Sequence, residues 1–373
     1  MTNTPVYLDW NASAPLRAQA RSAMIDALDR VGNPSSIHRF GRAARLVIET
    51  ARDAVAKLVG AEAAWVVFTS GGSEANALAL RGTDRPLFAS VVEHVSVTAA
   101  RPDGIALPVD GGGRIDLRAL ETALRSAGVP SLVSVMLANN ETGIVQPVAE
   151  AAAIAHAHGA VLHCDAVQGA GRIAIDMADL GIDLLTLSAH KLGGPQGVGA
   201  LVCRGDVVLT ALQRGGGQER GLRAGTENVA GIAGFGAACL AARLDLAKVA
   251  DIARLREQLE FGVRRVAAAT QIIGNDVPRI PNTSCLVLPG VEASTLVMAL
   301  DLAGVAVSAG SACSSGKVQP SHVLAAMGLP PAIVRGAVRV SLGWSTKAAE
   351  IDRCVDAWGE IAARLAARQS VAA

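Results

Sequence analysis

Short apolar runs alternate with helix-length segments through the first two thirds of the chain. The runs that predict β-strands lie at residues 64–70, 86–92, 131–137, 160–166, 183–189 and 199–203. Residues 73–82 and 147–159 predict helices between them, and the second begins at a proline and ends at a glycine. Strands that are apolar on both faces and separated by helices predict an α/β fold, with a mostly parallel sheet covered on both sides.

After about residue 245 the pattern changes. Residues 246–269 predict a charged connecting helix, residues 336–343 a strand, and residues 347–368 an amphipathic terminal helix. We therefore expect a large domain over residues 15–247. A smaller α+β domain is expected to combine residues 1–14 with residues 248–373.

The amino-acid composition limits the kinds of binding partner that we expect for this protein. The net charge of +1 and the 3% of aromatic residues give no reason to expect nucleic acid or an anionic membrane surface. The apolar run at 229–242 is too short to span a bilayer and predicts a buried helix, and the first twenty residues do not resemble a signal peptide. Six scattered cysteines without a CxxC pair predict neither a disulfide framework nor a zinc site. We expect a cytoplasmic protein with free thiols.

Polar residues gather where the predicted strands end, at 70–74, 93–94, 139–142, 165–168 and 188–191. Ligands of open α/β sheets bind at the carboxyl ends of the strands. Lys191, one of only five lysines, follows an apolar strand and precedes several glycines. A poorly solvated lysine has a lowered pKa, and its neutral amine attacks carbonyl groups. Taken alone, Lys191 is explained better as a loop residue paired with a carboxylate.

The neighbouring strand ends offer what a pyridoxal-phosphate site requires. Asp165 is a carboxylate for the pyridine nitrogen, and residues 71–74 form a glycine-rich helix start suited to a phosphate. His94 is a flat partner for the ring face, and Gln168 is a donor for the 3′-oxygen. These residues favour the Schiff-base interpretation of Lys191.

Ten sequence motifs occur in the order typical of one enzyme family, among them "YLDWNASAP", "FTSGGSEANALAL", "MLANNETGIVQP", "HCDAVQGAGR", "LSAHKLGGPQGVGAL" and "SAGSACSSG". The chain resembles a cysteine desulfurase of the group that includes nitrogen-fixation and iron–sulfur-cluster enzymes. The resemblance covers nearly the whole length. It implies the pyridoxal-phosphate-dependent transferase fold, with a seven-stranded type of sheet, and conversion of L-cysteine to L-alanine. Ser13 and Ala14 stand where relatives usually have two threonines, and they are given no role.

The resemblance also implies roles for individual residues. Lys191 would hold the cofactor and move the Cα proton, Asp165 would pair with the ring nitrogen, and Gln168 would bind the 3′-oxygen. His94 would stack on the ring and act as an acid/base. For the cofactor, the remaining implied contacts are Gly72, Ser73, Asn140, Ser188, His190 and, from a second subunit, Thr226. For the substrate carboxylate, they are Asn140 and Arg339.

Cys313 lies among small residues, which is typical of an exposed segment, whereas Cys203, Cys239 and Cys285 lie among apolar residues and are predicted to be core. The resemblance implies that the Cys313 thiolate takes the sulfur of cysteine as a persulfide. The sulfur would then pass to an acceptor protein, such as a scaffold for iron–sulfur clusters.

Other interpretations stay open. A selenocysteine lyase or a class V aminotransferase would keep the same lysine and aspartate, and a non-catalytic subunit could keep the fold alone. The histidines of residues 156–165 could suggest a metal, but their spacing does not favour one. Residues 214–229, rich in glycine and arginine, predict a subunit contact and therefore a homodimer.

Overall fold

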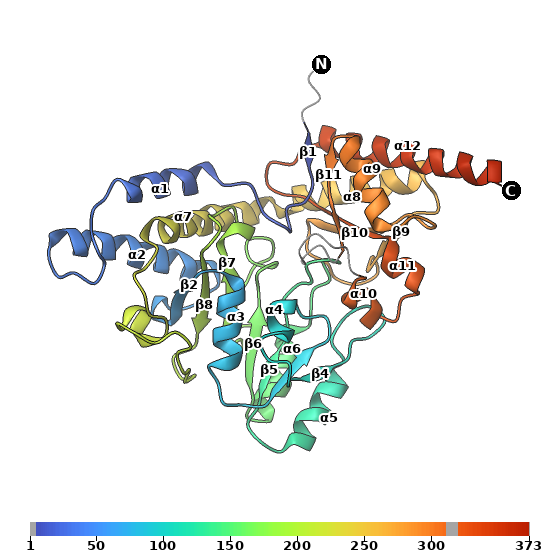
Figure 1. Ribbon diagram of the computed structural model, residues 1–373. Helices are drawn as coiled ribbons and strands as arrows, with labels where there is room; N and C mark the ends of the chain where they lie inside the picture. The colour runs from blue at the N-terminus through green and yellow to red at the C-terminus, as the bar shows by residue number, and fades with distance from the viewer. Residues whose placement is uncertain (1–4, 311–319, 373) are drawn as a thin grey trace.

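The computed structural model describes residues 5–310 and 320–372, and a seven-stranded sheet forms its centre (Figure 1). The strands follow the order β2 (Val66–Thr69), β8 (Gly199–Cys203), β7 (Leu184–Ser188), β6 (Val161–Asp165), β5 (Leu132–Ser134), β3 (Leu87–Ser90) and β4 (Ile105–Leu107). Adjacent strands are parallel except at β8, which is antiparallel to both β2 and β7. The predicted α/β fold with a mostly parallel sheet is confirmed.

The direction of β8 follows from the short connection that precedes it. Parallel neighbours need a crossover of roughly a dozen residues or more, whereas residues 189–198 contain only the short 3-10 helix η2 (Ala189–Lys191). Lys191 therefore lies in a tight connection at the end of β7. The strand β4 was missed from the sequence because Ile105 and Ala106 are exposed, so no continuous apolar run marks it.

Helices cover both faces of the sheet. One face carries α2 (Arg39–Leu58), α5 (Leu117–Ala127), α6 (Val148–Ala157) and α7 (Val229–Asp245), and the other carries α3 (Gly72–Arg81) and α4 (Val95–Thr98). The helical stretch Val229–Val266 contains an 18-residue window with a mean hydropathy of 1.5, enough by length and composition for a membrane span, but 56% of that window is buried in the protein. Its first part, α7, packs between α1 (Ala18–Leu28) and α2, as the sequence predicted for a buried helix.

The smaller unit lies at the upper right of Figure 1. Its antiparallel sheet has the order β12 (Ser308–Ala309), β13 (Ala337–Ser341), β10 (Thr283–Val287) and β9 (Gln271–Ile273). It packs with α8 (Val249–Val266), α9 (Ala293–Leu302) and α12 (Ala348–Ala372), and α10 (His322–Ala326) and α11 (Pro331–Gly336) complete it.

The N-terminal strand belongs to this smaller unit. β1 (Val6–Tyr7) pairs in parallel with β11 (Val305–Ala306), and Val6 and Leu8 share a hydrophobic cluster with α9, β13 and α12. This packing supports the proposed division, in which residues 1–14 join residues 248–373.

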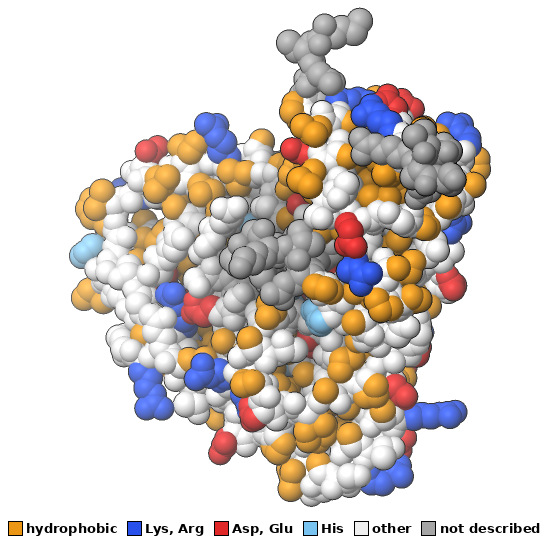
Figure 2. Space-filling model, turned by 45° about the vertical axis from the view of Figure 1, so that its right-hand side comes forward, with side chains coloured by type: hydrophobic (Ala, Val, Ile, Leu, Met, Phe, Trp, Pro, Cys, Tyr) orange, Lys and Arg blue, Asp and Glu red, His pale blue; other side chains and the backbone are white. Residues whose placement is uncertain are grey.

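On the face drawn in Figure 2, the Lys, Arg, Asp and Glu side chains of the described residues are interspersed rather than gathered by sign.

Candidate active site

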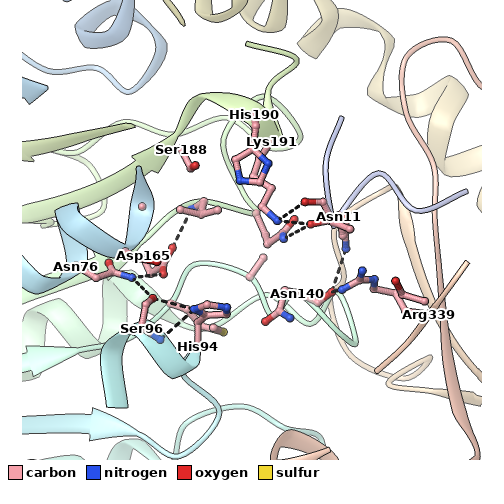
Figure 3. Close-up of a pocket in the computed structure, with 18 of the residues that line it drawn as sticks. Asn11, Asn76, His94, Ser96, Asn140, Asp165, Ser188, His190, Lys191 and Arg339 are labelled. Atoms are coloured by element: carbon pink, nitrogen blue, oxygen red, sulfur yellow. Dashed lines mark hydrogen bonds between the residues drawn. The ribbon is translucent and has the colours of Figure 1, made fainter. Parts of the chain in front are cut away.

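A cavity of about 370 Å³ lies at the carboxyl ends of the sheet strands, between the two units. It is lined by ten of the residues singled out from the sequence: Gly72, Ser73, His94, Asn140, Asp165, Gln168, Ser188, His190, Lys191 and Arg339. In Figure 3, Asp165 lies on one side of this pocket, Asn140 and Arg339 lie on the other, and Lys191 lies between them. The fold thus brings these side chains together, while their individual roles stay predictions.

The Lys191 amine is held by the N-terminal segment. Its Nζ donates to the backbone oxygens of Asn11, at 2.6 Å, and Ala12, at 2.9 Å. Gln168 donates from Nε2 to the same Asn11 oxygen, at 3.0 Å. The short helix η2 after β7 supplies the lysine, and residues 11–12 accept the hydrogen bonds of its amine, so the position of the amine depends on segments far apart in the sequence.

Asp165, at the end of β6, is buried and oriented by two donors. Its Oδ1 accepts the Val167 N–H at 3.0 Å, and its Oδ2 accepts the Asn76 amide at 2.8 Å. The neighbouring Glu93 is also buried, and burial together with the charge of Asp165 raises the pKa of the Glu93 carboxyl well above its usual value. Of these two buried carboxyl groups, Asp165 is the one that lines the pocket.

One end of the pocket suits a phosphate. The helix α3 begins there at Gly72, and its first backbone N–H groups form the positive end of the helix dipole. Ser73 and Ser188 add hydroxyls, and His190 lies beside them. Burial, and then the charge of Lys191, lower the pKa of His190 to about 4, so near pH 7 it can hydrogen-bond an anion but brings no charge.

The other end of the pocket carries an arginine. Arg339, on β13, is 3% exposed and donates from Nη1 to the Asn140 oxygen, at 3.1 Å, and from Nη2 to Asp9, at 2.7 Å. Ser308 donates to the other oxygen of Asp9, at 2.7 Å. A buried guanidinium with a fixed plane is suited to bind a carboxylate through two hydrogen bonds.

The model of the class V aminotransferase family matches residues 6–354. The chain belongs to this family. A cysteine desulfurase of Cereibacter sphaeroides is 45% identical, with 94% of each chain covered, and the cysteine desulfurase IscS of Dictyoglomus turgidum is 40% identical, with 96% of this chain and 95% of the relative covered. The NifS-like protein of Rickettsia africae has a structure similar to this one, with a TM-score of 0.90, 35% identity, and 96% and 99% of the two chains covered.

Class V aminotransferases, the cysteine desulfurases among them, depend on pyridoxal phosphate, and the pocket of this chain fits that cofactor. It has a helix start suited to an anion, a buried carboxylate and a lysine amine. A Cβ on Gly72 would lie 3.1 Å from Val167 and 3.5 Å from Ser188, so the glycine keeps this wall of the pocket open. The donor groups present are thus those that the cofactor of the family requires.

Two predicted residues are not placed in this pocket. Thr226 is exposed and lines a separate cavity with Ser70 and Arg223, so within one chain it does not reach the site. This position leaves open its predicted contact with a second subunit. Cys313 lies outside the described residues. Its described neighbours in sequence are close to the site: Ser308 lines the pocket, and His322 Nε2 lies 3.0 Å from the Glu93 backbone oxygen.

Two of the three histidines of residues 156–165, His156 and His163, have side-chain partners in the protein. His156 pairs with Asp183, at 2.9 Å. His163 is buried in the sheet, with its ring nitrogens 2.9 Å from Ser134 Oγ and 3.0 Å from Thr186 Oγ1. Within residues 5–310 and 320–372, no three His, Cys, Asp or Glu side chains are grouped as metal ligands.

The sequence interpretation missed several residues that line the pocket, namely Asp9, Asn11, Asn76, Ser96 and Ser308. Two of them lie in the quoted motif "YLDWNASAP", which gave no reason to choose them. The sequence could have identified Asn76 as a pocket residue, because it follows Gly72 by four residues and therefore lies on the same face of α3.

Proposed function

We propose that this member of the cysteine desulfurases converts L-cysteine to L-alanine and takes the sulfur onto Cys313 as a persulfide. The observation that carries the proposal is the single pocket in which Lys191 lies between an anion site with Asp165 and a buried arginine, Arg339. The first two groups suit the cofactor, and the arginine suits the carboxylate of an amino acid.

Bound pyridoxal phosphate supplies an electron sink for the negative charge that develops at the substrate Cα. Lys191 would hold it and later carry the Cα proton, and Asp165 would pair with its ring nitrogen. Gln168 would bind the 3′-oxygen and His94 the ring face. Gly72, Ser73, Ser188 and His190 would bind its phosphate, while Asn140 and Arg339 would bind the substrate carboxylate.

Cys313 is proposed as the sulfur acceptor because the other five cysteines are unsuited to it. Cys164, Cys203, Cys239, Cys285 and Cys354 are all buried, and burial raises the pKa of each thiol, to about 11 for Cys203 and about 12 for Cys285 and Cys354. A thiolate is the nucleophile in sulfur chemistry, so these protonated thiols are unreactive.

The sulfur step balances without a further reagent. The Cys313 thiolate attacks the sulfur of the substrate, and the new S–S bond forms as the carbon–sulfur bond breaks. The electron pair of the broken bond stays on carbon, which takes up a proton and becomes the methyl group of alanine. The persulfide on Cys313 then holds the sulfur for an acceptor protein, which we propose to be a scaffold for iron–sulfur clusters.

The test compares two cysteine variants. Cys313→Ser should keep the cofactor absorbance but release no alanine, and mass spectrometry should find no added sulfur on its peptide, because a serine hydroxyl is neither ionised near neutral pH nor sulfur-seeking. The control is Cys203→Ser, whose thiol already donates to the Arg204 and Val207 oxygens and which lies outside the pocket. Alanine release by Cys313→Ser at the parent rate would refute the assignment and favour a transaminase or a selenocysteine lyase.

The lysine assignment has its own test. Lys191→Ala should abolish the cofactor absorbance and turnover, and borohydride reduction of the parent protein should leave the pyridoxyl group on the peptide with Lys191. A pyridoxyl group on another lysine would contradict it.

We also propose that the protein is a homodimer. Thr226 is exposed and lines a cavity separate from the pocket of its own chain, and several large hydrophobic side chains of the α1–α2 region are exposed, including Leu28, Ile37, Phe40 and Leu46. Sedimentation should give twice the mass of one chain. A fully active monomer at low concentration would overturn the proposal.

A further inference from the structure

A continuous chain of hydrogen bonds links His94 to Asp165 through two residues that the sequence did not single out (Figure 3). The His94 Nδ1 atom lies 2.8 Å from Ser96 Oγ, and it also accepts the backbone N–H of Ser96, at 3.1 Å, as the N-cap of α4. The Asn76 amide lies 2.9 Å from Ser96 Oγ and 2.8 Å from Asp165 Oδ2. The helices α3 and α4 and the strand β6 thus meet in one network.

The direction of each hydrogen bond in this network is fixed by chemistry. The amide nitrogen of Asn76 carries two hydrogens and accepts none, so it donates to both Ser96 and Asp165. Ser96 Oγ accepts one of these hydrogens, and its own hydrogen is left for Nδ1 of His94. The backbone N–H of Ser96 donates to the same ring nitrogen. Nδ1 is therefore an acceptor, and the proton of the neutral ring is on Nε2.

We propose that Asn76 and Ser96 are positioning residues that hold His94 in the neutral tautomer with its proton on Nε2. The inference rests on the proposed function for its role in the reaction. The ring lines the pocket, so the Nε2–H is available there as a hydrogen-bond donor. A second proton can be added only at Nδ1, where it would meet the Ser96 N–H and force the hydroxyl to turn.

The groups around His94 shift its pKa in both directions. Burial lowers the pKa of His94, the nearby Asp165 raises it, and the nearby Lys191 and His322 side chains lower it further. Burial also raises the pKa of the Glu93 carboxyl, next in sequence, well above its usual value. The hydrogen bonds that Ser96 donates to Nδ1 stabilise the neutral ring and therefore also lower the pKa of His94. Removing the hydroxyl should therefore raise the pH at which His94 becomes charged.

The experiment is a long-range proton–nitrogen spectrum of the holoenzyme labelled with ¹⁵N-histidine, and a His94→Gln variant identifies the signals of this residue. The parent protein should show the Nε2–H tautomer. Ser96→Ala should raise the titration midpoint of His94 by roughly half to one pH unit, the size of one lost hydrogen bond. Ser96→Thr, which keeps a hydroxyl, should restore the parent midpoint.

The matched control is Thr98→Ala, which removes an exposed hydroxyl from the same helix α4. It should leave the midpoint unchanged. A proton on Nδ1 in the neutral parent ring would overturn the inference, and so would a midpoint that Ser96→Ala does not move. The spectrum does not depend on turnover, so a failure of the desulfurase proposal would show separately, as absence of alanine release.

Discussion

The segment with the predicted subunit contact is anchored by one buried ion pair, and we expect Glu219→Gln to test its contribution. Both oxygens of Glu219 accept from Arg52, at 2.7 and 2.8 Å, and one of them also accepts the Phe68 N–H, at 2.8 Å. Both side chains of the pair are 2% exposed. Glu219 has a φ of +46°, a left-handed conformation that costs a non-glycine residue about 1–2 kcal/mol. The side-chain contacts must therefore offset this backbone strain.

The expected magnitude follows from the partners that are left. Removing one member of a buried pair costs about 3–5 kcal/mol, because the other charge stays buried without compensation. Arg52 would keep its contacts with the Val66 oxygen and with Glu49, at 2.7 and 3.0 Å, so we expect Glu219→Gln to cost about 3 kcal/mol, at the low end of this range. Arg52→Met should cost a similar amount, and the double variant should lose less than the sum of both.

The assay is unfolding in urea, followed by circular dichroism. The control is Glu292→Gln, which breaks the exposed pair of Glu292 with Arg335, with side chains 59% and 51% exposed. Exposed pairs contribute about 0–1 kcal/mol, so its midpoint should hardly change. If Glu219→Gln and Glu292→Gln lowered the midpoint equally, the buried pair would not anchor this segment. Single-variant losses that simply add in the double variant would lead to the same conclusion.

Three further predictions concern the pocket and the sheet behind it. Burial lowers the pKa of His163 from 6.5 to about 4. Between these two pH values the unfolded chain binds a proton at this residue and the folded chain does not. The free energy of unfolding should therefore fall by about 2 kcal/mol from about pH 7.5 to about pH 5. His163→Gln should lose that part of the slope in urea titrations at both pH values. Gly193→Ala should lower stability and cofactor absorbance, because Gly193 has a φ of +79° and an added Cβ would clash with the Trp344 ring. The control is Gly197→Ala, which should show the backbone strain alone, because Gly197 has a φ of +76° but nothing within 4 Å of an added Cβ. Arg339→Lys should lower kcat/KM for cysteine by about 10–100-fold, mainly through KM, because a lysine cannot form the two-point contact with a carboxylate; an unchanged KM in alanine-release kinetics would contradict this role.

The sequence by itself predicted the strands of the large sheet that are buried on both faces. Such strands are continuous apolar runs, so β6 and β7 could be located to within two residues. The polar residues at or just after the ends of these strands, Asp165 and Lys191, were predicted to meet because parallel strands end at the same edge of a sheet. The exposed edge strand β4 lacked that signal and was missed.

The tertiary structure alone decided which distant residues complete the site. Asp9 and Arg339 form an ion pair across 330 residues of sequence, and Asn11 supplies an oxygen for the Lys191 amine. The tie from Asn76 to Asp165 also depends on how α3 packs against the sheet. Hydrophobic periodicity records which face of each element is buried, because burial is a property of the residue and its immediate neighbours. It does not record which buried faces pack together, and the contacts of Asp9, Asn11 and Asn76 depend on that packing.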